Sequence, residues 1–262
     1  MPLTEFQSKI VKLLSSNRNE ESYLAGGAAL NIKPNSHRFS NDLDYFQDSI
    51  LRVSQAFELD YRTLIDHGYC VDTVMKTPGF VRSVVSANKE STKVEWVHDT
   101  AWRFLPVVRD ELAGFVLHPI DVALNKVLAL AGRDEPRDYL DVVEIHLSLL
   151  PLGSLIWAAA GKDPGFTPFS LLELLKRKGR YRQEDFQRLH LNKVVEVTEL
   201  KVVWLAALGS AEKLITRLPK EEVGCLYYSP ITKKFVSPDH DSKETIPHYG
   251  KPGGVLPIVE QL

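Results

Sequence analysis

The chain has 262 residues, 44% of them hydrophobic, and its 32 Lys and Arg nearly balance 34 Asp and Glu, for a formal net charge of −2. This length suits one large domain or two modest ones, and the two cysteines, Cys70 and Cys225, form neither a disulfide framework nor a zinc-ligand pattern. Because the net charge is slightly negative, a nucleic-acid partner would need a local basic patch on the protein. No apolar run has the length of a signal peptide or a membrane span, so we expect a cytoplasmic protein with no membrane partner.

Residues 1–117 are predicted to form a mixed α/β domain. Thr4 can cap a helix that runs to about Ser15, in which apolar residues recur at helical spacing. The following segments indicate a strand at 22–25, a glycine turn that starts a helix, a strand at 42–46, a helix at 50–66 and about four strands between 69 and 117. These last strands are rich in β-branched and aromatic residues and are expected to form a meander.

Residues 118–218 show helical periodicity and are predicted to form an all-α bundle. The expected helices cover residues 119–132, 136–149, 154–160, 168–178, 182–191 and 195–218. Residues 219–262 hold six of the 15 prolines and are predicted to form a short hairpin at 226–236 followed by an extended tail. The predicted fold class is α+β, with a mixed sheet in an N-terminal α/β domain, a C-terminal helical bundle and a Pro/Gly-rich hairpin and tail.

Two aspartates in the second predicted strand are the first candidates for chemistry. Asp42 and Asp44 lie two positions apart, so both carboxylates project from one face of the strand. Such a pair suits Mg²⁺, or Mn²⁺ in its place, because Mg²⁺ binds one or two carboxylates together with phosphate oxygens. Upstream, Gly26 and Gly27 stand where a strand turns into a helix, which would allow a phosphate chain to approach the backbone. The alternative is a tight turn followed by a solvated acidic strand end.

Two sequence blocks carry a resemblance to a known family. The first is Gly-Gly-x-Ala-Leu at 26–30 with Arg-x-Ser-x-Asp-Leu-Asp-x-Phe at 38–46, and the second runs from Lys126 to Arg133 and on to Asp141. In this order they resemble the AbiEii/MenT group of nucleotidyltransferase toxins, which belong to the polymerase-β-like nucleotidyltransferase superfamily. The resemblance covers about residues 23–146. It implies a catalytic domain at 1–117, followed at 118–218 by a helical domain that completes the cleft for the NTP and the acceptor.

The resemblance also implies a third carboxylate on a neighbouring strand. Glu95 lies inside an alternating run, whereas Asp99 ends that run, where a capping or turn role is equally suitable. Asp42, Asp44 and Glu95 are then the implied catalytic residues and metal ligands, with Glu95 either holding a metal ion or accepting the proton of the attacking hydroxyl. The alternative for Glu95 is a cross-strand partner of Lys or Arg. The chain departs from the family pattern in this glutamate and in Ala28, which stands where threonine is common.

Further residues are candidates for catalysis and nucleotide binding. Lys126 lies on a helix that is predicted to be buried, where a lysine suits the neutralisation of a nucleotide triphosphate. The alternative is a lysine whose aliphatic chain extends to the rim of the helix and keeps its ammonium group in water. The resemblance implies that Asp141 is a functional acid that fixes Lys126 or the nucleotide, with a purely structural ion-pair network involving Asp138 as the alternative. The remaining nucleotide-binding candidates are Gly26, Gly27, Arg38 and Ser40, of which the last two could instead stabilise their loop.

A basic segment in the helical half is the candidate RNA contact. It contains Lys176, Arg177, Lys178, Arg180 and Arg182, with Tyr181 among them. Arginine and lysine bind a phosphate backbone and an aromatic ring stacks on a base, so the segment suits RNA, although basic runs are also common on solvated surfaces.

The predicted function is Mg²⁺-dependent transfer of a nucleoside monophosphate from an NTP to an acceptor hydroxyl. The resemblance implies that the acceptor is the 3′ end of tRNA, that the chain is the toxin of a toxin–antitoxin system, and that its partner is a cognate antitoxin. The alternatives are a kinase-like phosphotransferase, a nucleotidyltransferase acting on a protein or small molecule, and a non-catalytic module that binds nucleotide or RNA.

Overall fold

The computed structural model describes residues 3–32, 36–192, 194–238 and 245–258. The chain forms two compact units, of which the first comprises residues 1–122, 190–193 and 251–254 and the second comprises the remainder. The sequence-based division has its boundaries after residues 117 and 218. In the structure, the change of unit falls within the helix that begins at Pro119, and the C-terminal stretch contributes to both units.

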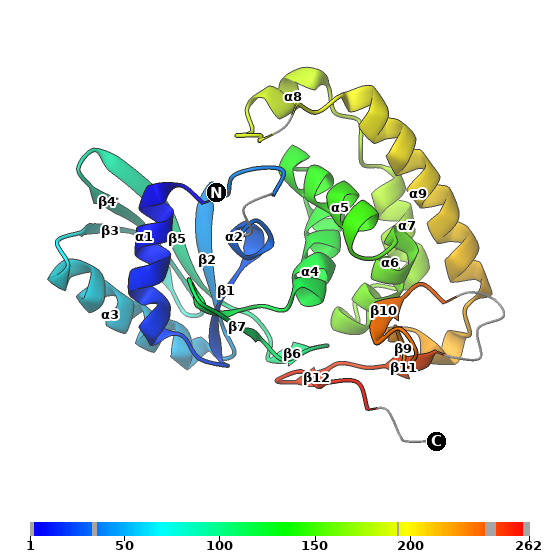
Figure 1. The fold of residues 1–262 in the computed structure, drawn as a ribbon, viewed down its shortest axis with the longest axis horizontal. Coiled ribbons are helices and arrows are strands. Elements are labelled where there is room, and N and C mark those ends of the chain that lie inside the picture. The colour runs from blue at the N-terminus through cyan, green and yellow to red at the C-terminus, as the bar shows by residue number, and fades with distance from the viewer. Residues whose placement is uncertain (1–2, 33–35, 193, 239–244, 259–262) are drawn as a thin grey trace. The chain divides into compact units, whose positions relative to one another are not determined.

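A seven-stranded mixed sheet forms the centre of the first unit (Figure 1). The strands lie in the order β3-β4-β5-β2-β1-β8-β7. Their bounds are Ser22–Ala25 for β1, Asp42–Gln47 for β2, Cys70–Thr77 for β3, Phe80–Ala87 for β4, Glu90–His98 for β5, Val108–Asp110 for β7 and Gly114–Val116 for β8. β2 pairs with β5, and β1 with β8, in parallel; the other pairs are antiparallel. The predicted mixed sheet is confirmed, but the meander ends at β5, because β8 pairs instead with β1.

Helices cover one face of this sheet. α1 (Glu5–Leu14) and η1 (Ser15–Asn17) precede β1, α2 (Gly26–Leu30) follows it, and α3 (Ile50–Asp66) follows β2. Thr4 and Gln7 form a reciprocal capping box at the start of α1, as the position of Thr4 predicts. Apolar residues of α1 and α3 share a buried core with strand residues that point toward them, including Leu43 and Val94. Because strand side chains alternate, the neighbours of these residues face away from this core.

A buried ion pair lies in the layer between the helices and the sheet. Arg18 donates to Asp60 of α3, and neither side chain is exposed to solvent. Trp96 Nε1 donates to Asp60 Oδ2 at 2.7 Å, and Asn17 Nδ2 donates to Asp60 Oδ1 at 2.9 Å. The Arg18 guanidinium also lies 4.4 Å from the centre of the Tyr45 ring. The pair therefore connects η1 and α3 to both β2 and β5.

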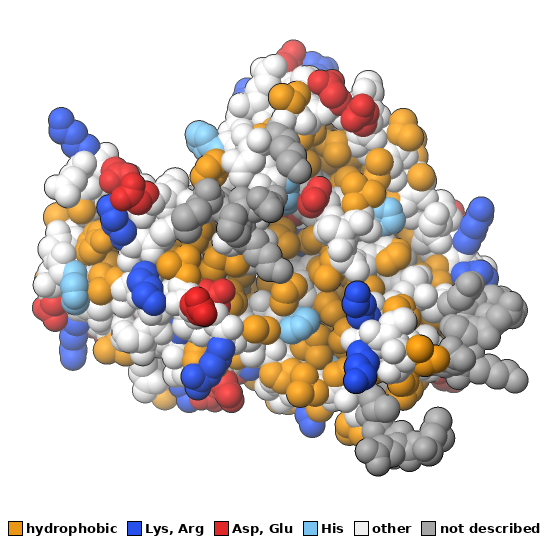
Figure 2. All heavy atoms as spheres, viewed as in Figure 1, with side chains coloured by type: hydrophobic (Ala, Val, Ile, Leu, Met, Phe, Trp, Pro, Cys, Tyr) orange, Lys and Arg blue, Asp and Glu red, His pale blue; other side chains and the backbone are white. Residues whose placement is uncertain are grey.

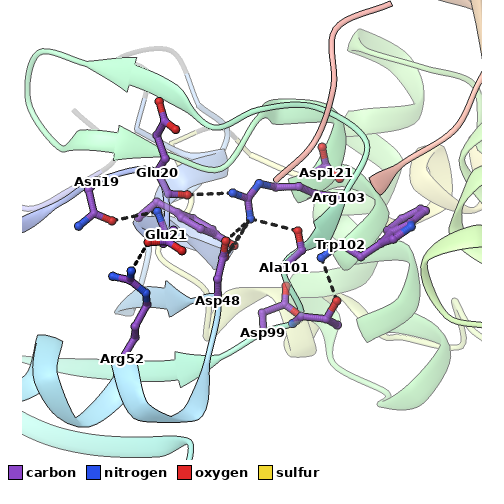
Figure 3. Close-up of polar contacts among 12 residues, drawn as sticks. Asn19, Glu20, Glu21, Asp48, Arg52, Asp99, Ala101, Trp102, Arg103 and Asp121 are labelled. Carbon is purple, nitrogen blue, oxygen red and sulfur yellow. Dashed lines mark hydrogen bonds and ion pairs between the residues drawn. The ribbon is translucent and has the colours of Figure 1, made fainter. Parts of the chain in front are cut away.

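A second polar cluster lies at the other end of β2 from its aspartates (Figure 3). Arg103 of β6 (Trp102–Arg103) donates from Nη1 to both oxygens of Asp48, at 2.9 and 3.1 Å, and from Nη2 to the Glu20 carbonyl at 2.8 Å. β12 (Lys251–Pro252) pairs antiparallel with β6. The cluster thus joins the start of β1, the end of β2 and a segment from near the end of the described chain.

The second unit is mainly helical, which confirms the predicted bundle. Its helices are α4 (Pro119–Gly132, of which the first residues belong to the first unit), α5 (Pro136–Ser148), α6 (Leu152–Lys162), α7 (Pro168–Lys176), α8 (Gln183–Gln187) and α9 (Val197–Arg217), followed by η2 (Lys220–Glu222). α6 and α9 pack so closely that a Cβ on Gly153 would lie 3.0 Å from Ala211 Cα. Among the described residues, no single helix has the length and apolar composition of a membrane span. The helices α5 and α6, which are bent by 116° relative to each other, reach that length and composition only when they are taken together.

A small sheet completes the second unit. β9 (Leu226–Ser229) pairs antiparallel with β10 (Lys234–Val236) and with β11 (Ile246–His248). The hairpin expected at 226–236 is therefore present. The tail expected to be extended instead contributes β11 to this sheet and β12 to the first unit.

We expect Asp60→Asn to lower the free energy of unfolding by about 3–5 kcal/mol, because it leaves the buried Arg18 guanidinium without its counter-ion. Urea unfolding measures this change. The matched control is Asp66→Asn at the exposed end of the same helix, which should stay within about 0.5 kcal/mol of the wild type. A loss below about 1 kcal/mol in Asp60→Asn would contradict the role assigned to this pair.

Candidate functional site

The aspartates of β2 lie on the sheet face opposite α1 and α3. Leu43 and Tyr45 belong to the core shared with α1 and α3, so the intervening Asp42 and Asp44 project from the other face. Asp42 is 7% exposed and Asp44 is half-buried. The spacing of these two residues in the sequence therefore predicts their shared face correctly.

The two glycines after β1 make room for side chains of this same region. Gly26 has a φ of 59°, and a Cβ there would overlap the Asp44 carboxylate. A Cβ on Gly27 would lie 3.0 Å from Arg38 Nη2 and 3.1 Å from Ser40 Oγ. The glycines thus allow the backbone of α2 to approach the chain's own carboxylate, guanidinium and hydroxyl groups. Their predicted role in holding a triphosphate stays a prediction.

Arg38 and Ser40 are buried and stabilise the loop that leads into β2. Arg38 Nη1 donates to the Phe39 carbonyl, and Ser40 Oγ donates to the Asp42 carbonyl, both at 2.8 Å. These contacts match the alternative that the sequence left open for both residues. Whether either residue also reaches a phosphate stays a prediction.

A segment distant in sequence pairs with this loop within the first unit. The Phe39 N–H donates to the His190 carbonyl, and the Asn192 N–H donates to the His37 carbonyl, both at 2.9 Å. Asn192 Nδ2 donates to the Ser36 carbonyl at 2.7 Å. This pairing explains why α8 ends at Gln187, although the periodicity predicts a helix over 182–191.

Glu95 faces the aspartates from β5. In the parallel pairing of β2 with β5, Asp42 is opposite Lys93 and Asp44 is opposite Glu95. Glu95 Oε1 accepts from Arg82 Nε at 2.8 Å and lies 3.2 Å from Lys93 Nζ, which is itself 2.9 Å from Asp42 Oδ2. Arg82 is the cross-strand partner of Glu95 on β4, which is the structural arrangement considered for this glutamate from the sequence.

Lys93 and Arg82 are the site residues that sequence reasoning missed. Lys93 stands two positions before Glu95, so the alternation of the strand already places both on one face. The pairing partner of this strand could not be derived from spacing alone. Burial acts to lower the pKa of the Lys93 ammonium, but its contacts with Asp42 and Glu95 outweigh burial and raise that pKa above its usual range.

The donor chemistry of this region suits Mg²⁺ when oxygens of a substrate or of water complete the ligand shell. Among the residues that the structure describes, no group of three His, Cys, Asp or Glu side chains is arranged to hold a metal ion. Asp42 and Asp44 nevertheless provide two hard carboxylates on one strand face, and Mg²⁺ commonly takes one or two carboxylates and completes its shell with phosphate oxygens and water. The role of Glu95 as a third ligand stays a prediction. Asp99 accepts the Thr100 N–H at 2.9 Å just after β5, as a turn residue would.

Lys126 and Asp141 come together in the second unit. Lys126 Nζ lies 2.9 Å from Asp141 Oδ2 and 3.0 Å from Asp138 Oδ1, and both carboxylates are completely buried. Arg133 Nε lies 2.6 Å from the other oxygen of Asp138. Burial acts to raise the pKa of Asp138, but the attraction of Lys126 and Arg133 outweighs it and lowers that pKa below its usual range. The ion-pair network considered from the sequence is therefore present.

The basic segment is less uniform than its sequence indicates. Lys176 pairs with Glu173 at 2.8 Å and with Glu212 at 3.0 Å. Tyr181 is 7% exposed, donates its hydroxyl to Asp134 at 2.5 Å and packs against other aromatic rings, so it offers no face for stacking in this structure. The exposed members are Arg177, Arg180 and Arg182, with Lys178 half-buried. On the face drawn in Figure 2, basic side chains are scattered among acidic and apolar ones, so any RNA contact there must be local.

No protein-family model and no curated protein matches the chain. Among solved structures, MenT4, a nucleotidyltransferase toxin from Mycobacterium tuberculosis, is 17% identical over 82% of this chain and 83% of its own, with a TM-score of 0.53. JHP933 from Helicobacter pylori is 18% identical over 82% of this chain and 95% of its own, with a TM-score of 0.49. The likeness to MenT4 shows that the chain shares its fold, and the fold implied by the sequence resemblance is confirmed.

We expect Asp138 to contribute stability that acid removes. Because its pKa is lowered in the folded state, the contribution is complete above about pH 4, the range of an unfolded aspartate, and disappears as the pH falls through the folded-state pKa. Asp138→Asn should lower the unfolding free energy at pH 7 by about 3 kcal/mol and reduce the further loss between pH 4 and pH 2.

Urea unfolding at pH 7, 4 and 2 measures both effects. The matched control is Glu144→Gln, an exposed position on the same helix, which should leave the unfolding free energy at pH 7 within about 0.5 kcal/mol of the wild type. Parallel acid profiles of Asp138→Asn and the wild type would refute the assignment.

Proposed function

We propose that the chain is a nucleotidyltransferase that moves a nucleoside monophosphate from an NTP to an acceptor hydroxyl. The observation that carries this proposal is the pair Asp42 and Asp44 on one face of β2, with Glu95 in register on the parallel strand β5. The fold shared with MenT4 supports it, since that protein is a nucleotidyltransferase toxin.

The reaction requires one bond to form as another breaks. The acceptor oxygen forms a bond to the α-phosphorus of the NTP, and the bond from that phosphorus to the bridging oxygen breaks, so that pyrophosphate leaves with the electron pair. The proton of the acceptor hydroxyl passes to a carboxylate or to water. Glu95 is our candidate to accept it through the oxygen that Arg82 and Lys93 do not engage.

Mg²⁺, or Mn²⁺ in its place, would be held by Asp42 and Asp44, with Glu95 as a candidate third ligand, and when bound would offset the negative charge of the phosphate oxygens. The chain's own task at these positions is to present the carboxylates in a fixed orientation. Gly26 supports this by leaving space beside Asp44, and the buried loop of Arg38 and Ser40 supports it by holding the start of β2.

Lys126 is our candidate cation for the triphosphate. Its two buried carboxylate partners hold its ammonium group from two sides, and 8% of the side chain remains exposed. Asp141 would then be a positioning residue that acts through Lys126. We further propose that the helical half, including α4 and α5, contributes in this way to nucleotide binding.

The biological role that we propose is that of a growth-arresting toxin in the cytoplasm. The acceptor would be the 3′ end of tRNA, and a cognate antitoxin protein would control the activity. These assignments rest on the motif resemblance and on the likeness to a toxin.

The Asp44→Asn variant tests the reaction. Wild-type protein incubated with Mg²⁺, tRNA and labelled NTP should transfer label to RNA from the α position and not from the γ position. Asp44→Asn should reduce transfer by roughly 100-fold or more, because it removes a carboxylate that the phosphate transfer requires. The matched control is Asp72→Asn, an exposed aspartate of β3 in the same sheet, which should retain activity.

Other labelling results would favour the alternatives. Label on RNA from the γ position alone would indicate a kinase-like phosphotransferase, and label on protein would indicate a different acceptor. Growth arrest that persists in Asp44→Asn would indicate a binding role without catalysis.

The exposed arginines of the basic segment provide a separate test of RNA contact. Replacing both Arg180 and Arg182 with Ala should weaken RNA binding and reduce the dependence of log K on log salt by up to about two, because up to two phosphate contacts are lost. NTP binding should stay unchanged. Fluorescence anisotropy of labelled tRNA at several salt concentrations measures the effect, and Lys176→Ala is the control because acidic residues already pair with that lysine. An unchanged salt dependence would place the RNA contact elsewhere.

A further inference from the structure

Lys93 connects the two strands that carry the candidate catalytic carboxylates. It lies on β5, directly opposite Asp42 of β2 and two positions before Glu95. Its Nζ is 2.9 Å from Asp42 Oδ2 and 3.2 Å from Glu95 Oε1. A single ammonium group therefore bridges two carboxylates from different strands.

The surroundings make these contacts stronger than those of an ordinary surface ion pair. The side chains of Asp42 and Glu95 are only 10% and 13% exposed, whereas that of Lys93 is 36% exposed. The carboxylates are thus poorly screened by water, and the ammonium has an open side toward which it can move. Arg82 is exposed to a similar extent, at 37%, so both cations of this group have room on the solvent side.

Lys93 and Arg82 share Glu95 as a partner, but they differ at Asp42. Arg82 Nε contacts Glu95 Oε1 at 2.8 Å. Of these two cations, Lys93 is the one that forms an ion pair with Asp42. The Lys93 ammonium lies 2.9 Å from Asp42 Oδ2 and therefore occupies the space through which a divalent cation would approach this oxygen. Mg²⁺ would have to come closer still, to about 2.0–2.1 Å from the oxygen. A cation on either oxygen of Asp42 would in addition be repelled by the ammonium.

We propose that Lys93 is a positioning residue that occupies the Asp42 carboxylate when no divalent cation is bound, and that it thereby lowers the affinity of this site for such a cation. The inference rests on the proposed function, because it concerns the same carboxylates. Lys93 holds Asp42 and Glu95 in register between β2 and β5, and it must leave Asp42 when a cation binds there. Its charge is then free to face the phosphate oxygens of a bound nucleotide.

Mn²⁺ binding without nucleotide tests this role independently of catalysis. Isothermal titration calorimetry would compare the wild type with Lys93→Met, which keeps the aliphatic length and removes the ammonium. We expect Lys93→Met to bind Mn²⁺ at least about 10-fold more tightly, because the competing charge beside Asp42 is gone. Its melting temperature should be lower than that of the wild type without metal and should rise more when Mn²⁺ is added.

Arg82→Met is the matched control. It also removes one positive charge from a contact with Glu95, but that charge is not paired with Asp42, so we expect Mn²⁺ affinity to change by less than about 3-fold. An equal gain in both variants would show general electrostatics and overturn the specific role of Lys93. Unchanged or weaker binding in Lys93→Met would also overturn it.

Asp42→Asn separates this inference from the proposed function. If Asp42→Asn abolishes Mn²⁺ binding and Lys93→Met leaves it unchanged, only the role of Lys93 is refuted. If the wild type, Lys93→Met and Arg82→Met all fail to bind Mn²⁺, the proposed metal site fails and this inference fails with it.

Discussion

The buried Arg18–Asp60 ion pair determines which way the candidate catalytic strands face. Asp60 accepts from Trp96, and Arg18 lies over Tyr45, so one charged pair holds the residue after Glu95 and the residue after Asp44 on the helix side of the sheet. Because side chains alternate along a strand, the carboxylates must then point to the opposite face. A slip of either strand by one residue would bury a carboxylate in the apolar core and expose Tyr45 or Trp96.

In each unit the cations of the candidate site pair with carboxylates of the same unit, but these cations differ in their exposure to solvent. On the sheet face, Lys93 and Arg82 pair with Asp42 and Glu95, and more than a third of each cationic side chain is exposed to solvent. In the helical unit, Lys126 is enclosed by Asp138 and Asp141, so its position is fixed. A partly exposed cation suits exchange with an incoming charge, whereas an enclosed one suits a constant contribution to the local field.

The sequence predicts the local features of this molecule well. The two-residue spacing of Asp42 and Asp44 defines their common face, Thr4 predicts the start of α1, and Pro136 predicts the start of α5. These features depend on backbone geometry within a few residues. The glycine at position 26 likewise indicates a turn, and the structure confirms it with a positive φ.

Features that depend on distant pairing could not be predicted in the same way. Lys93 is opposite Asp42 only because β5 pairs in parallel with β2 across α3, β3 and β4, and spacing along the chain does not reveal this register. The sequence places Tyr181 in the candidate RNA contact, yet this residue is buried, because rings from α5 and α8 pack against it. Similarly, the helical periodicity near His190 is overridden by pairing with the loop before β2.

The composition of the first unit has a consequence for synthesis on the ribosome. Its sheet can assemble from the first stretch of the chain, but the loop of Arg38 gains its backbone partners only after Asn192 has been made, and β6 gains β12 only after Pro252. A nascent chain that stops before Asn192 has its aspartates in place while the loop leading into them lacks its backbone hydrogen bonds to residues 190–192. The loop before the aspartates is thus completed about 150 residues after β2 has been made, once Asn192 has followed.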